Sequence, residues 1–176
     1  MAWTAPRTWT DGELVTKAIM DPHVRDNFIS TMHVQARKTA DETVNNSAAY
    51  QSDDHLFFSV AANEVWVVQH ILRVNTTAAA DIKFQWTFPS GTAGGFFIGN
   101  NTAETLSNLS PAFSASPLDL GGIGVAGTGD RLVVFIIMHV NGATPGTLQL
   151  QWAQAAATAV NTQVLTGSAM LAARVT

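Results

Sequence analysis

The chain of 176 residues contains no cysteine, which excludes disulfide bonds and thiolate metal sites and leaves packing or assembly as the source of stability. Only 12% of the residues are charged, well below the usual share of about 25%. Because 47% are hydrophobic, we expect part of this poorly charged surface to be covered. The net charge of −4 and the lack of any Lys/Arg cluster argue against a nucleic-acid partner, because proteins that bind nucleic acids normally carry a basic patch.

Long apolar runs are also missing, since no stretch approaches the roughly 20 residues that a membrane-spanning helix needs. We therefore expect no membrane partner. The segment after Met1 lacks the charged and then apolar layout of a signal peptide, so a soluble protein made in the cytoplasm is expected. At this length we expect one domain with a short appendage.

The common catalytic motifs are absent as well. The sequence has no P-loop, dinucleotide fingerprint, Gly-x-Ser-x-Gly elbow or His-Glu-x-x-His pair. We therefore expect no enzyme, no catalytic residues and no cofactor. A hydrolase with a dispersed site is the alternative, and assays against esters and glycosides would test it.

The most apolar stretch, residues 131–140, is apolar on both faces when it is read as a strand. A second sheet can cover one of these faces. The other face needs a cover from the N-terminal segment or from another copy of the chain. Residues 65–74 show the same two-sided pattern, so the sequence predicts an oligomer.

Several shorter segments alternate as strands do. In residues 81–89 the side chains of Ile82, Phe84, Trp86 and Phe88 are expected to point inward. Asn141-Gly142 and Pro145-Gly146 predict that residues 147–153 form a hairpin with residues 131–140, and residues 163–175 are expected to form a final strand bulged at Gly167. About eight strands, with almost no helix after residue 50, predict an all-β fold, a jelly-roll-like β-sandwich.

The first 50 residues are expected to form an extended arm, a short α-helix and a connector for anchoring and oligomerisation, with the sandwich over residues 51–176. A helix is expected over residues 12–32, with Thr16 as its N-cap and a bend or restart at Asp21-Pro22. Residues 33–52 read as a connector or as a first strand.

Candidate anchoring residues lie in this N-terminal segment. The helix would show one apolar stripe that docks on the sandwich or on copies of itself, formed by Val15, Ile19, Val24 and Phe28. Two tryptophans of the arm, Trp3 and Trp9, either pack on their own domain or anchor the arm on a neighbouring protein.

Residues 12–16, Gly-Glu-Leu-Val-Thr, are followed by Met20 and by His-Val-Arg-Asp-Asn at residues 23–27. This segment resembles the N-terminal segment of small structural proteins of tailed bacteriophages, of the minor tail, tail-fibre or head-fibre type. Asp21 stands where those proteins usually have Asn.

A second resemblance covers Asp-Asp-His-Leu at residues 53–56, Ala-Ala-Asn at 61–63, Trp66, Asp-Ile-Lys-Phe at 81–84 and Pro89. It is similar to the β-sandwich domain of phage tail-fibre and capsid-decoration proteins. The two resemblances imply a homotrimer on the virion surface, made in the host cytoplasm, with the major capsid or tail protein as its partner.

Asp53-Asp54-His55 offers metal-ligand chemistry, but successive side chains of an extended chain point to alternate sides. We therefore expect hydrogen bonding there and no metal site. His70 and His139 are expected to be core or interface histidines, with a pH-sensitive contact as the alternative. The cluster His23, Arg25, Asp26 and Asn27 is expected to cap a helix and form ion pairs.

Phe96 and Phe97 follow Gly94-Gly95 and either pack in the core or form an exposed platform that stacks on sugars. The second reading supports a different function, a carbohydrate-binding receptor module of a tail or head fibre. It would use the loops of residues 90–128, and its partner would be a glycan of the host surface.

Overall fold

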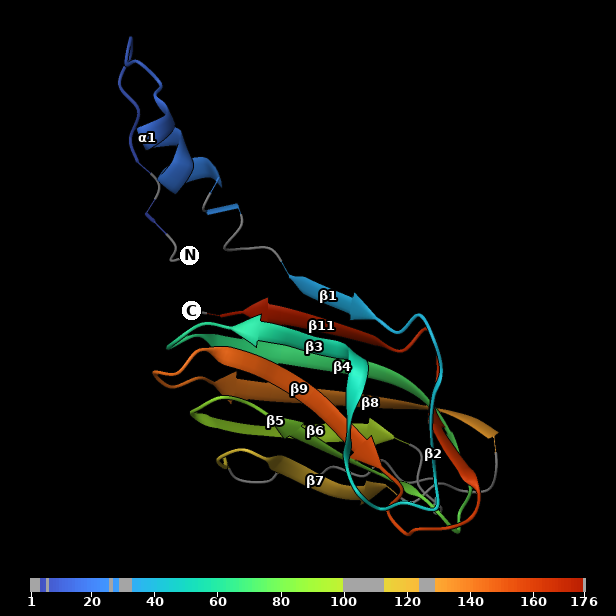
Figure 1. Ribbon diagram of the computed structural model, residues 1–176. Helices are drawn as coiled ribbons and strands as arrows, with labels where there is room; N and C mark the ends of the chain where they lie inside the picture. The colour runs from blue at the N-terminus through green and yellow to red at the C-terminus, as the bar shows by residue number, and fades with distance from the viewer. Residues whose placement is uncertain are drawn as a thin grey trace.

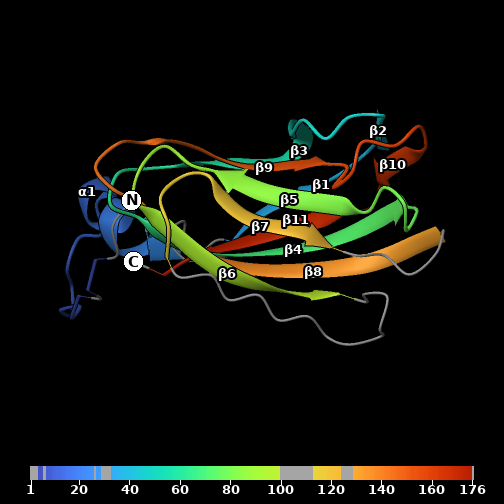
Figure 2. The same ribbon diagram turned by 90° about the horizontal axis from the view of Figure 1, so that it is seen from below.

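The computed structural model describes residues 4, 5, 7–25, 27, 28, 33–99, 113–123 and 129–175. The described part contains two antiparallel sheets packed face to face, an all-β sandwich as predicted (Figures 1 and 2). Its strands are β1 (Val34–Arg37), β2 (Glu42–Asn45), β3 (Gln51–Val60), β4 (Val65–Thr76), β5 (Ile82–Thr87), β6 (Thr92–Gly99), β7 (Leu118–Ile123), β8 (Gly129–Val140), β9 (Gly146–Ala153), β10 (Asn161–Val164) and β11 (Ala169–Arg174).

The large sheet is centred on β4. Strand β8 pairs with one edge of β4 and continues to β6, while β11 and β10 pair with its other edge and continue to β1 and β2. The small sheet has the order β3-β9-β5-β7. Figure 2 shows the small sheet lying over the large one.

Eleven strands stand in the described residues where about eight were expected, because three of them are only four residues long. Strands β1 and β2 precede residue 51 and are hydrogen-bonded to β11 and β10. The sandwich therefore starts at Val34, so residues 33–52 form first strands of the domain and not a connector. The expected final strand is divided into β10 and β11 by a turn at Gly167, whose φ of 84° suits glycine.

The predicted hairpin between β8 and β9 is wrong. Strand β9 pairs with β3 and β5 in the small sheet, so residues 141–145 cross from one layer to the other. Asn141 explains the crossing, because its buried amide donates to the carbonyl oxygen of Ala61 at 2.6 Å and to that of Thr144 at 3.1 Å. These bonds hold the chain in a layer-to-layer connection that local turn residues do not specify.

The core lies between the two sheets. The expected inward side chains of residues 82–88 are all buried. The ring of Phe135 from β8 lies edge-on to Phe84 at 4.8 Å and to Trp86 at 4.9 Å, so the two layers are joined by aromatic contacts. Both expected core histidines are buried too, His70 against Trp86 and His139 against Phe88.

The N-terminal segment has less helix than expected. α1 spans Lys17–Met20 and continues as a π-helical turn, η1, over Asp21–Arg25. Thr16 holds the N-cap position as predicted, although its side chain makes no cap hydrogen bond. Pro22 lacks a backbone N–H, which accounts for the altered turn.

The segment also folds back on itself. Two hydrogen bonds of 2.8 Å join the backbone of Thr4 to the Asn27 amide, and Asp21 pairs with Lys17 and Arg25. Of the expected cluster, Arg25 therefore forms an ion pair and Asn27 ties the segment to Thr4, while Asp26 lies outside the described residues. Figure 1 shows this segment standing clear of the sandwich. Among the described residues, no helix is long and apolar enough to cross a bilayer.

His70 predicts how stability depends on pH. Burial lowers its pKa from 6.5 to about 3, because the charged ring would lose its hydration in the core. The unfolded chain therefore binds the proton first, and stability falls as the pH drops from 6.5 towards 3, by up to about 4 kcal/mol.

The measurement is urea unfolding across this pH range. We expect a shallower decline for His70→Leu than for the natural chain, and an unchanged decline for the exposed control His33→Leu. An equal decline in His70→Leu and the natural chain would contradict this account.

Candidate functional site: an uncovered apolar sheet face

Strand β8 is apolar on both sides, and the sandwich covers only one of them. Val133, Phe135 and Ile137 point into the core and are buried. On the other side Leu132 is 57% exposed and Met138 is 39% exposed. Between them Val134 and Ile136 are half-buried, so the strand presents a partly exposed apolar row.

The neighbouring strands extend this row into a surface. Side chains directly opposite one another on adjacent strands share a face, and the register places Val67 of β4 beside Met138, Ile71 beside Val134, and Phe96 of β6 beside Ile136. We call this surface the outer face. Its apolar members are Val65, Val67, Ile71, Phe96, Leu132, Val134, Ile136, Met138, Val140 and Leu171.

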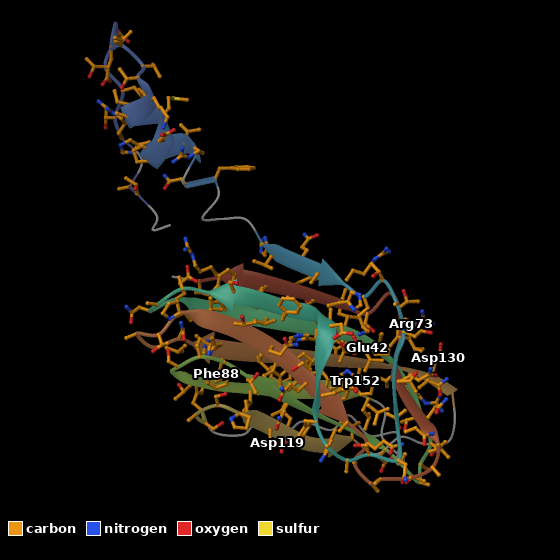
Figure 3. All side chains as sticks on the ribbon, in the orientation of Figure 1. Glu42, Arg73, Phe88, Asp119, Asp130 and Trp152 are labelled. Atoms are coloured by element: carbon orange, nitrogen blue, oxygen red, sulfur yellow. The ribbon has the colours of Figure 1, made fainter. Side chains whose placement is uncertain are left out.

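Charge is confined to the edges of the outer face. Arg73 bonds Asp130 at 2.8 Å near one end of β4 and β8, where both side chains are about half exposed (Figure 3). Within the face itself Gln69 is the polar residue of β4, between Val67 and Ile71. Contiguous apolar surface with a polar rim is typical of sites where proteins bind other proteins.

The N-terminal stripe is not the cover of the outer face. Val15, Val24 and Phe28 are exposed and Ile19 is half-buried, in a segment that stands clear of the sandwich (Figure 1). Trp9 is also exposed, with the Arg7 guanidinium over its ring at 5.4 Å. Trp3 lies outside the described residues. The structure therefore does not show the stripe docked on its own sandwich, which was one of the two expected arrangements.

The two candidate receptor-facing phenylalanines both lie in β6. Phe96 is half-buried and belongs to the outer face, whereas only the backbone of Phe97, paired with Phe135, is described. Exposed Phe113 lies over Gly94, where a Cβ atom would be 3.0 Å from its ring. The outer face is thus extended by an aromatic side chain that the sequence did not single out.

A second cluster is ionic and lies inside the sandwich. Lys38, just after β1, and Asp53 of β3 are fully buried, and the Lys38 Nζ atom lies 2.8 Å from both Asp53 Oδ2 and Glu42 Oε1. Asp53 and His55 point to one side, as alternation predicts. Figure 3 places Glu42 at the end of the sandwich where β2 begins.

This cluster does not offer a vacant metal site. Ligand atoms of Glu42, Asp53 and His55 lie within 4.8 Å of one another, but the Lys38 ammonium already sits against both carboxylates. A divalent cation would have to displace it. The sequence pointed to Asp53 and missed Lys38 and Glu42, because nothing in their local pattern marks Lys38 as buried or Glu42 as its partner.

Comparisons with known proteins give no family for the chain. No family model matches it, and no curated protein matches it. Among solved structures, it is similar to the infectious bursal disease virus VP2 subviral particle, with a TM-score of 0.26 and 7% identity over 82% of this chain and 40% of that one.

A structure of the Gx strain of infectious bursal disease virus gives a TM-score of 0.19 and 10% identity over 82% of this chain and 38% of that one. The chain spans about two fifths of the length of these neighbours. Similarity at these TM-scores has no bearing on what this chain does.

The burial of Lys38 against two carboxylates predicts that its removal destabilises the fold. Lys38→Met would leave two carboxylates facing each other without their cation, and breaking a buried pair in this way costs about 3–5 kcal/mol. We expect a loss of that size in the free energy of unfolding, measured with urea. The control is Lys17→Met, whose ion pair with Asp21 is on the surface and should matter little. Equal effects of the two substitutions would contradict the structural role of Lys38.

Proposed function

We propose that this protein is a structural component of a virus particle that acts by assembly and not by catalysis, as a trimer on the particle surface. The observation that supports action by assembly is the outer face, an apolar sheet surface that is partly exposed among the described residues. Burying such a surface gives about 25 cal/mol per Å², and permanent assemblies bury about 2,000 Å² or more.

The outer face and the N-terminal segment would have different partners. The outer face lies on long paired strands of the large sheet, which suits contact with other copies of the chain. The segment stands apart and exposes Trp9, Val24 and Phe28, which suits anchoring on the particle. The virus particle, the number of copies and the choice of a tailed bacteriophage, with the capsid or tail as the attachment site, rest on the resemblance of residues 12–27 and 53–89.

A carbohydrate-binding module is the alternative function. Phe96 shares the outer face with Ile136 and Met138, and an apolar neighbourhood of this kind favours burial against protein over stacking on a sugar. Selective binding on a glycan array, by a chain that stays monomeric, would support the alternative instead.

The oligomer can be tested with a charge pair on the outer face. Val67→Lys combined with Met138→Glu places opposite charges on directly opposed residues, so the single copy keeps a favourable cross-strand pair. Burying that pair between copies would be costly. We expect light scattering at micromolar concentration to give a trimer for the natural chain and a monomer for this variant, with unchanged circular dichroism.

The matched control is Phe57→Glu, because Phe57 is 46% exposed on the small sheet and lies away from the outer face. This variant should remain a trimer. A monomeric natural chain would contradict the assembly function, and a trimeric Val67→Lys/Met138→Glu variant would contradict the role of the outer face.

A further inference from the structure

The buried ionic cluster holds its amine against a carboxyl group with little freedom on either side. The Lys38 backbone is fixed next to the turn just before β11, since its N–H donates to the Ser168 carbonyl at 2.8 Å and its own carbonyl accepts from the Gly167 N–H at 3.0 Å. From there its side chain runs into the sandwich, where it is fully buried. Nζ is thereby held against Asp53 of the opposite sheet.

Asp53 is held just as firmly. Its Oδ1 accepts the backbone N–H groups of His55 at 3.0 Å and Leu56 at 2.9 Å, and its Oδ2 faces Lys38. The β3 ladder is interrupted between Ser52 and Phe57, which frees these two N–H groups to turn towards the carboxylate. Two backbone donors on one oxygen form an arrangement that stabilises negative charge in acyl-transfer reactions.

We propose that Lys38 and Asp53 condense into an intramolecular amide, an isopeptide bond between Nζ and Cγ, with Glu42 as the proton carrier. Cγ is one bond from Oδ2, so the contact of 2.8 Å between Nζ and Oδ2 brings the amine close to the carboxyl carbon that it would attack. Glu42 Oε1, 2.8 Å from Nζ, is the second carboxylate in contact with the amine.

The reaction balances without any oxidant or co-reactant. The Lys38 ammonium gives one proton to Glu42, which passes it to Oδ2 of Asp53. The free amine then attacks Cγ, and negative charge builds on Oδ1, where the N–H groups of His55 and Leu56 stabilise it. The attacking nitrogen gives a second proton through Glu42 to Oδ2, the Cγ–Oδ2 bond breaks, and Oδ2 leaves as water.

The product keeps one hydrogen on nitrogen and retains Oδ1 as the amide oxygen, still bonded to its two donors. Glu42 returns to its starting form. The bond would join the large sheet to the small sheet across 15 residues in a chain that has no cysteine to do so. This inference is independent of the proposed function, because it concerns the inside of a single copy.

The test is the mass of the intact, denatured full-length protein after purification in folded form. We expect a mass one water molecule below that of the sequence. Trypsin should fail to cleave after Lys38. Since residues 39–72 contain no Lys or Arg, Lys38 and Asp53 then lie in one peptide, and fragmentation should show a loop closed between their side chains. A succinimide at an aspartate loses the same mass, so a linear peptide that bears the loss would overturn the proposal, as would an intact mass equal to that of the sequence.

Two variants test the roles of the residues. Lys38→Arg keeps the positive charge but should show its full sequence mass, since no amide can form. Glu42→Gln keeps the shape of the side chain and should lose the bond or form it far more slowly. The control Glu64→Gln alters a carboxylate that pairs with Arg174 elsewhere and should retain the bond. A Glu42→Gln protein that is linked as fast as the natural chain would overturn the role of Glu42.

Discussion

A two-layered β-sandwich shelters one face of each strand, and the other face must meet water or a second molecule. In this chain β4 and β8 are apolar on both faces, and they pair along twelve residues at the centre of the large sheet. Their inner faces build the core with β5 and β9. Their outer faces remain partly exposed in the part of the chain that the structure describes, so the sandwich buries only one of the two apolar faces.

The interior of the sandwich contains charged side chains, whereas the outer face of the large sheet is apolar. A lysine and an aspartate are fully enclosed, while apolar side chains such as Leu132 and Val67 lie outside. Before any bond forms between them, the enclosed charges are tolerated because each is paired within the sandwich and Asp53 also accepts two backbone N–H groups. Leu132 and Val67 are exposed to water among the described residues, and contact between copies would bury them.

The sequence was sufficient where local pattern decides the outcome. Alternation identified the inward residues Phe84 and Trp86, the two-sided strand at residues 131–140, and the β-sandwich class. Sequence-based prediction failed where contacts between distant parts of the chain determine the structure. The turn residues after β8 suggested a hairpin, but the bond from Asn141 to the Ala61 carbonyl sends the chain to the other layer. The Lys38–Asp53 pair was missed for the same reason, because it joins two different sheets.

The central claim is that the outer face is covered by other copies in the working protein, and methionine oxidation by peroxide tests it directly. In a single copy Met138 is 39% exposed and Met170 is fully buried. The account predicts that in the assembled protein Met138 is oxidised almost as slowly as Met170. Oxidation of Met138 as fast as in the urea-unfolded chain, while Met170 stays protected, would contradict it.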